Sequence, residues 1–332
     1  MLFIDVRTPV EFEKGHRPGA VNVPLFTNEE RHDVGLLYKE EGPQKAVRLG
    51  LSLVGPKMHS LVDEVDRITG GPSETPLSVY CWRGGQRSGS MAWLLETAGY
   101  TVYKCLGGYK AYRQEVLQRL AAERPYRVLT GSTGVGKTEW LHLLKEHFGF
   151  QIIDLEGLAN HRGSAFGHLG QEKQPTSEQF ENTLDAALSL CDPLRPIWLE
   201  DESQLIGKVW MSHEFYTQLG KAPRLKIDRI ASERAAYLAE IYGSAEPEKL
   251  KEVFLRLARK IGGQNVAPAH LAIDEGRWAD AAELALHYYD KTYQYSLEKK
   301  EIPPVASVDI SGLDQQTALQ SIAQESLKLP FQ

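Results

Sequence analysis

One cysteine of this sequence stands at the start of a loop suited to binding an anion. The loop, Cys81-Trp82-Arg83-Gly84-Gly85-Gln86-Arg87-Ser88, lies between an apolar run and a helical pattern. Its two glycines permit a tight turn with inward N–H groups, and its two arginines add positive charge. Such surroundings lower a thiol pKa from about 8.5 toward roughly 3.5–7.5, which creates a nucleophilic thiolate. We predict that Cys81 is catalytic and that its anion-binding loop consists of Arg83, Gly84, Gly85, Gln86, Arg87 and Ser88.

A second anion site has the pattern of a phosphate-binding loop. Residues 131–138 match G-x-x-x-x-G-K-[ST] in full, with a predicted strand before them and a predicted helix after them. Backbone N–H groups, the helix N-terminus and Lys137 would surround phosphate oxygens, and the Thr138 hydroxyl can reach Mg²⁺. The motif fits ATP, GTP or another diphosphate equally well. The predicted phosphate-binding residues are Gly131, Ser132, Thr133, Gly134, Val135, Gly136, Lys137 and Thr138.

Two acidic residues, Glu200 and Asp201, follow the apolar run 196–199. In P-loop proteins a carboxylate at this place organises the metal ion. The sequence does not choose between the two acids, and it assigns no complete set of metal ligands.

The remaining cysteines, Cys105 and Cys191, fit the role of small hydrophobic residues, and we assign neither a chemical function. Cys105 falls in the middle of a predicted strand. With three cysteines and no C-x-x-C pair, the chain has neither a disulfide framework nor a zinc ribbon. This usage indicates the reducing cytoplasm.

The elements that carry these motifs alternate between strand and helix. Pro125 ends one α/β pattern, and a second pattern starts after it. The alternation predicts an α/β fold with mostly parallel sheets and with ligands at the carboxyl ends of the strands. Strands are predicted at 2–6, 20–24, 77–80, 101–106, 127–130, 150–153 and 196–199. We predict three parts: 1–120 with the cysteine loop, 125–230 with the P-loop, and a helical region at 231–332.

Composition sets broad limits on function. The 332 residues are 42% hydrophobic and 25% charged, which is ordinary for a globular protein. No apolar run approaches the roughly 18–20 residues of a membrane span, and the first residues do not read as a signal peptide. The net charge of −6 counts against a nucleic-acid partner but leaves room for a local basic face.

The first 120 or so residues resemble a rhodanese domain. The resemblance rests on Asp5-Val6-Arg7, Glu11-Phe12, the segment 16–24, the cysteine loop and Gly107-Gly108-Tyr109, in the family's order. The segment between Asp5 and Cys81 is longer than in a simple rhodanese. The strand and helix that usually come first are missing ahead of Leu2, so this start reads as truncated.

Nearly the whole chain resembles the tRNA 2-selenouridine synthase family, in which a P-loop domain follows a rhodanese domain. The matching segments are the cysteine loop, 154–167, 199–203, 288–290 and 297–300. The resemblance implies that the substrate is tRNA with 2-thiouridine at the wobble position. It also implies S-geranylation from geranyl diphosphate, then replacement of sulfur by selenium from selenophosphate, with Cys81 in the selenium step.

The same resemblance points to a substrate loop in the segment 154–167 and to a tRNA surface. Loops at this edge of a sheet commonly carry function. We expect the tRNA to lie across both domains with its wobble base between them. The predicted substrate-loop residues are Glu156, His161, Arg162 and Ser164. The predicted phosphate contacts in the tail are Arg224, Arg229, Arg234, Arg256, Arg259 and Lys260.

Two other functions stay open on the sequence. Cys81 and Arg87 have the C-x5-R spacing of cysteine phosphatases, and activity on a phosphotyrosine peptide would identify such an enzyme. A nucleotide-gated adaptor with an inert rhodanese module is the non-catalytic alternative, and the intact cysteine loop argues against it.

Overall fold

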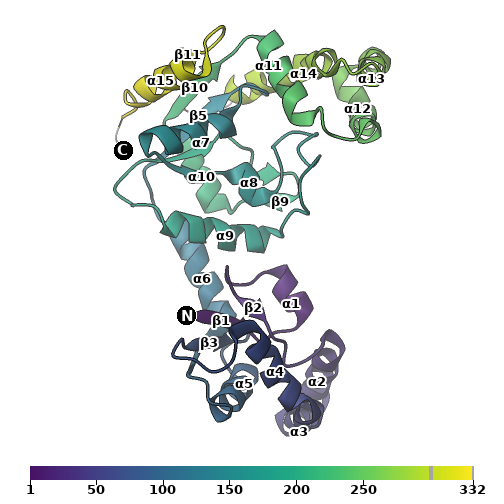
Figure 1. Cartoon of the computed structure of the whole chain (residues 1–332), viewed down its shortest axis with the longest axis vertical. Helices are drawn as coiled ribbons and strands as arrows, with labels where there is room; N and C mark the ends of the chain where they lie inside the picture. The colour runs from purple at the N-terminus through teal and green to yellow at the C-terminus, as the bar shows by residue number, and fades with distance from the viewer. Residues whose placement is uncertain (299–301, 331–332) are drawn as a thin grey trace. The chain divides into compact units, whose positions relative to one another are not determined.

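The computed structural model describes residues 1–298 and 302–330, and they divide into two compact units. Unit 1 comprises Met1–Arg119 together with Glu181–Ala186. Unit 2 comprises Leu120–Phe180 and the described residues from Ala187 onward. In Figure 1 the strands and helices run from purple at the N-terminus to yellow at the C-terminus. Residues 181–186 belong to unit 1 although the chain before and after them belongs to unit 2. No local pattern in the sequence indicates this assignment.

Unit 1 is built on a four-stranded parallel sheet in the order β2-β1-β3-β4. The strands are β1 (Leu2–Asp5), β2 (Val21–Asn22), β3 (Leu77–Tyr80) and β4 (Val102–Lys104). β1 and β3 lie at the centre, and all four residues of β3 are buried. β4 is shorter than predicted, so Cys105 follows this strand and does not lie within it. Cys81 directly follows β3, which places it at the carboxyl edge of the sheet, where ligands bind in such folds.

Six α-helices and one 3₁₀ turn surround this sheet. α1 begins with a capping box, in which Thr8 and Glu11 each accept a hydrogen bond from the other's backbone N–H. The long stretch after residue 28 forms α2, α3 and α4. α5 begins at Gln86, so its N-terminus lies inside the cysteine loop. The helices are α1 (Pro9–Lys14), α2 (Asn28–Glu41), α3 (Pro43–Val54), the 3₁₀ turn η1 (Gly55–Lys57), α4 (Met58–Thr69), α5 (Gln86–Thr97) and α6 (Gly108–Ala121).

Unit 2 contains a five-stranded parallel sheet in the order β11-β10-β5-β7-β6. Its central strand, β5, is fully buried and leads into the P-loop. The predicted α/β architecture with parallel sheets is therefore confirmed. The strands are β5 (Tyr126–Gly131), β6 (Gln151–Ile153), β7 (Ile197–Glu200), β10 (Arg224–Asp228) and β11 (Ala306–Asp309), with a separate antiparallel pair, β8 (Leu205–Ile206) and β9 (Val209–Trp210).

The helices of unit 2 cover the sheet and also form a lobe of their own (Figure 1). The lobe consists of α11 to α14 and has a core that includes Phe254, Ile273 and Ala285. None of the helices in the described part of the chain has the length and apolarity that crossing a membrane requires. The helices are α7 (Lys137–Phe148), α8 (Leu155–Ala159), α9 (Ser177–Ser189), α10 (His213–Lys221), α11 (Ala231–Tyr242), α12 (Pro247–Ile261), η2 (Gly263–Asn265), α13 (Val266–Asp274), α14 (Trp278–Glu298) and α15 (Gln315–Ser326).

The C-terminal region is helical except at β11, which pairs with β10 at the edge of the five-stranded sheet. The prediction of helices alone beyond residue 230 is wrong for these four residues. Only Val308 of the strand is buried. So short an edge strand has no continuous apolar run or long alternation by which it could be recognised.

Candidate functional site

Glycines determine the backbone path of the cysteine loop. Gly84 (φ 67°) and Gly108 (φ 61°) both adopt the left-handed conformation. A Cβ on Gly108 would stand 2.3 Å from the carbonyl oxygen of Cys81 and 2.4 Å from the backbone nitrogen of Gly84. The backbone N–H of Tyr109 also donates to the Cys81 carbonyl, at 2.9 Å. The N-terminus of α6 therefore packs directly against the backbone of the cysteine loop. Only glycine at position 108 allows so close an approach.

The Cys81 thiol is buried and surrounded by hydrogen-bond donors. Its Sγ lies 3.3 Å from the Ser88 hydroxyl. Burial raises the pKa of the thiol, but hydrogen bonds from the Ser88 hydroxyl and from the backbone N–H groups of Ser88, Arg83 and Gly85 outweigh it. The pKa is therefore lowered. Burial raises the pKa of Cys105 and of Cys191. The donor-lined loop thus distinguishes Cys81 chemically from the other two cysteines.

The two arginines of this loop have different surroundings. Arg83 is exposed, whereas Arg87 forms a two-pronged ion pair with Glu11 at 2.6 and 3.1 Å. Burial raises the pKa of Glu11, but the hydrogen bond and charge of Arg87 and the Thr8 N–H together lower it. Arg87 therefore anchors the loop to the N-terminus of α1. The sequence contained Glu11 in a family motif, but no spacing connected it with Arg87.

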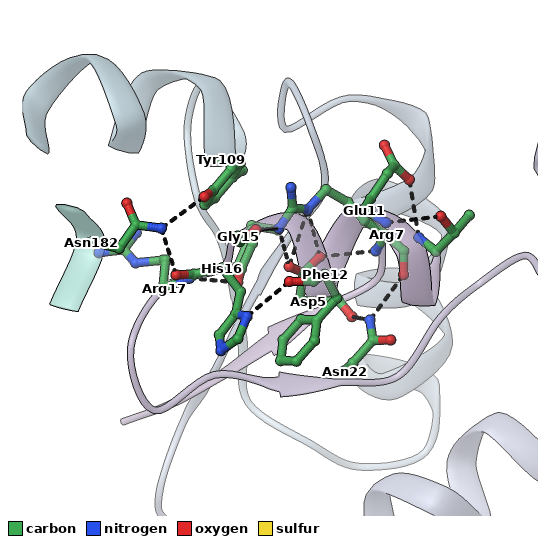
Figure 2. Close-up of polar contacts among 12 residues, drawn as sticks. Asp5, Arg7, Glu11, Phe12, Gly15, His16, Arg17, Asn22, Tyr109 and Asn182 are labelled. Carbon is green, nitrogen blue, oxygen red and sulfur yellow. Dashed lines mark hydrogen bonds and ion pairs between the residues drawn. The ribbon is translucent and has the colours of Figure 1, made fainter. Parts of the chain in front are cut away.

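A cluster of polar contacts around Asp5 and Arg7 fixes the end of β1 (Figure 2). Arg7 binds both carboxylate oxygens of Asp5 and donates to the carbonyl of Gly15 at 2.7 Å. Its guanidinium carbon stands 3.8 Å from the ring centroid of Tyr109. The Tyr109 hydroxyl in turn accepts a hydrogen bond from the amide of Asn182, at 2.8 Å. This network positions the helix N-terminus that supports the Cys81 carbonyl, and it includes a residue of the distant segment 181–186.

The P-loop has the backbone form that its motif predicts. Gly131, Gly134 and Gly136 all have positive φ angles, and α7 begins at Lys137. A Cβ on Gly134 would stand 3.1 Å from the side chain of Leu238, so α11 packs closely on the loop. Arg234 of α11 donates to the carbonyl of Thr133 at 3.0 Å. The helical lobe thus supports the backbone of the P-loop through α11.

The acids beside the P-loop differ from each other in their contacts. Glu200 is fully buried and accepts from the N–H of Leu155, and burial raises its pKa well above the ordinary value. Asp201 accepts from the hydroxyl of Thr130 at 2.6 Å. The two side chains predicted as metal-organising groups therefore make structural hydrogen bonds. In residues 1–298 and 302–330, no group of three or more His, Cys, Asp or Glu side chains could hold a metal ion.

The carboxyl groups of Glu156 and Glu202 contact each other close to the side chain of Lys137. The Thr138 hydroxyl donates to Glu156 at 3.1 Å. Burial and then the charge of Glu156 raise the pKa of Glu202 to about 8, and burial also raises the pKa of Glu156 although Lys137 opposes it. The sequence identified Glu156 through the family segment. It missed Glu202, although the acidic run after β7 contains this residue.

The predicted substrate loop folds over this pair. Gly163 has a φ of 63°, and a Cβ there would stand 2.8 Å from a carboxylate oxygen of Glu202. His161 is buried, its Nδ1 has no hydrogen-bond partner among the described residues, and burial lowers its pKa. The guanidinium carbon of Arg162 stands 5.7 Å from the ring centroid of Tyr242. Ser164 accepts from the N–H of Phe166, which turns the loop back toward the helical lobe.

Two of the basic residues predicted to contact tRNA are buried. Arg224 is buried and donates to backbone carbonyls, and Arg234 is buried in an ion pair with Asp290. These two arginines stabilise the fold, so the prediction that they contact phosphate is wrong. Arg256 remains exposed. Residues 299 and 300 of the last family segment lie outside the described residues.

Comparison with known proteins gives matches along both units. A model of the rhodanese-like domain matches residues 1–115, and a model of the tRNA 2-selenouridine synthase AAA domain matches residues 124–265. A tRNA 2-selenouridine synthase from Sulfurovum sp. (strain NBC37-1) is 36% identical and aligns with 89% of this chain and 88% of its own. The enzymes of the same name from Shewanella halifaxensis (strain HAW-EB4) and Marinobacter nauticus (strain ATCC 700491 / DSM 11845 / VT8) are each 34% identical, over 90% of this chain and 89% of theirs.

Proposed function

Since the chain belongs to the tRNA 2-selenouridine synthase family, we propose that it replaces the sulfur of wobble 2-thiouridine in tRNA by selenium from selenophosphate. We propose that S-geranyl-2-thiouridine, made from geranyl diphosphate, is the intermediate. The observation that carries this proposal is that the two loops predicted to bind anions are separate, and that the loop of Cys81 surrounds a thiol of lowered pKa with N–H donors. Each phosphorylated co-substrate thereby has a site suited to it.

The first step needs a stabilised leaving group. The sulfur of the base attacks the first carbon of the geranyl group, the carbon–oxygen bond breaks, and diphosphate leaves while the base loses its N3 proton. In this proposal the P-loop N–H groups and Lys137 hold the departing diphosphate. The Thr138 hydroxyl and the Glu156 carboxylate, 3.1 Å apart, would hold Mg²⁺, which would add charge at the same oxygens.

The second step exchanges sulfur for selenium at C2 of the base. Selenium from selenophosphate bonds to C2, geranyl thiol leaves, and water takes the phosphoryl group as phosphate, so that all atoms balance. The Cys81 loop offers N–H donors for the phosphoryl group. In this proposal the Cys81 thiolate bonds to C2 as geranyl thiol leaves, and it is itself displaced when selenium bonds to C2. A free thiol of this kind needs a reducing compartment, which supports a cytoplasmic location.

Mass spectrometry of nucleosides tests the assignment directly. The enzyme is incubated with tRNA that carries 2-thiouridine, first with geranyl diphosphate alone and then with selenophosphate added. We expect S-geranyl-2-thiouridine in the first reaction and 2-selenouridine in the second. Unmodified 2-thiouridine in both reactions would refute the proposal.

A further inference from the structure

A large apolar groove opens beside Cys81 in unit 1. Its volume is about 1410 Å³, and Cys81 itself forms part of its lining. The walls come from α2, α3, α5 and the cysteine loop. Helices α2 and α3 lie in the segment between Asp5 and Cys81, which is longer than in a simple rhodanese. This longer segment thus supplies two of the walls.

The side chains in this groove are unusually exposed for their type. Leu36 is 46% exposed, Leu51 66% and Trp93 58%, and all three line it. Single exposed apolar residues are common, but a contiguous exposed set of this kind marks a binding surface. A second apolar cavity, in unit 2 between Thr133 and Phe254, holds only about 50 Å³. That space is smaller than the roughly 150 Å³ that takes a benzene-sized ligand. The groove beside Cys81 is therefore the larger space for a hydrocarbon.

The charged side chains that line the groove are basic. Arg31, Lys39 and Arg83 line it, and no Asp or Glu is among its described lining residues. An apolar surface with basic side chains complements a ligand that has both a hydrocarbon group and a phosphate backbone. A neutral lipid suits it less well, because such a ligand would leave the basic side chains without a partner.

We propose that this groove binds the geranyl group of the S-geranylated wobble base during the selenium step, with anticodon-loop phosphates near Arg31, Lys39 and Arg83. The inference rests on the proposed function, in which the geranyl chain is still bonded to sulfur when selenium reaches C2. That chain must lie within a few bonds of the reacting carbon, and the groove contains Cys81 in its lining. The geranyl thiol that leaves would remain on the same apolar surface.

Binding of labelled anticodon stem-loops tests this inference without selenophosphate. Three stem-loops are compared by fluorescence anisotropy: S-geranyl, S-methyl and unalkylated 2-thiouridine. The S-methyl base has the same alkylated sulfur but almost no hydrocarbon. Each buried methylene contributes about fourfold in affinity, so burial of only three carbons gives about 60-fold. We expect the enzyme to prefer the S-geranyl over the S-methyl stem-loop by at least that factor.

Two substitutions place a carboxylate on the groove wall. Leu36→Asp and Leu51→Asp change exposed side chains and leave the fold intact, which circular dichroism verifies. We expect each to remove most of the geranyl preference and to leave the S-methyl affinity within a few-fold. Leu117→Asp is the matched control, because Leu117 is 44% exposed on α6 and does not line the groove.

The possible outcomes distinguish a failure of the groove inference from a failure of the proposed function. A wild-type enzyme without geranyl preference, or a preference that both groove variants retain, overturns the groove inference. A preference that Leu117→Asp also removes overturns it as well, and so does a dimer in solution that Leu51→Asp dissociates. If the wild-type enzyme prefers the S-geranyl stem-loop but does not convert it to selenouridine with selenophosphate, the proposed function fails and the groove remains.

Discussion

Gly108→Ala is expected to displace the cysteine loop, because the added methyl group has no room. The new Cβ would stand 2.3 Å from the carbonyl oxygen of Cys81 and 2.4 Å from the nitrogen of Gly84. Both neighbours are backbone atoms, so no side-chain rotation can relieve the contact. The residue also has a φ of 61°, a conformation that L-residues with a side chain rarely adopt.

The cost has two parts of known size. The left-handed conformation costs about 1–2 kcal/mol for a residue with a Cβ. Overpacking against a fixed neighbour costs about 1–3 kcal/mol more. The structure around the loop should therefore lose about 2–5 kcal/mol of local stability, by the sum of these two terms. This corresponds to amide exchange that is faster by a factor of about 30 to several thousand.

Hydrogen exchange of the Tyr109 and Lys110 amides measures this loss, since both donate to carbonyls of the cysteine loop. Gly70→Ala is the matched control, because Gly70 has a φ of 79° but nothing within 4 Å of the added Cβ. The control should leave exchange at the loop unchanged. Equal protection of the two amides in wild-type enzyme and Gly108→Ala would show that the loop tolerates the methyl group, and the close-packing argument would be wrong.

The other predictions concern the two anion sites and the tRNA. Cys81→Ala should abolish selenium transfer and spare geranylation in nucleoside mass spectrometry, because only Cys81 has an activated thiol; equal loss of both steps in a folded variant would contradict this separation. Lys137→Ala should weaken geranyl diphosphate binding about 10- to 100-fold, as expected for loss of one charged hydrogen bond, and calorimetry that finds unchanged affinity for every phosphorylated ligand would exclude a binding role. Because its thiol pKa is lowered, Cys81 should stay reactive toward iodoacetamide as the pH falls below the range of ordinary thiols, whereas Cys105 and Cys191, with raised pKa values, should react only at higher pH; peptide mapping that finds the same pH profile for all three would refute this assignment. The affinity for tRNA should fall as salt rises, and Arg256→Ala should reduce that salt slope by about one if this exposed residue contacts a phosphate; an unchanged slope would remove it from the interface.

Features that depend on local backbone chemistry could be predicted from the sequence alone. Positive φ angles at Gly84 and Gly134 occur where the two glycine-rich motifs require them. Such loops are defined by a few consecutive residues, so their form can be read without knowledge of distant contacts. The alternation of strands and helices likewise predicted parallel sheets with both loops at carboxyl ends of strands.

Which charged side chains are available for chemistry depends on tertiary packing. Glu11 pairs with Arg87 across 76 positions of sequence, and Arg234 is buried against Asp290. The fold brings Glu202 next to Glu156 and buries both carboxyl groups, and this burial raises the pKa of each. A charged side chain can be solvated, paired or buried. Which of these applies depends on neighbours that are distant in sequence and come close only in the folded protein.

The groove beside Cys81 shows the same limit for apolar residues. Leu36 and Leu51 read as ordinary members of helical segments, and the sequence does not show whether they face a core or solvent. Packing of α2 and α3 leaves both exposed in the lining of the groove. Burial depends on the neighbours that cover each side chain, and only folding brings those neighbours together or leaves them apart.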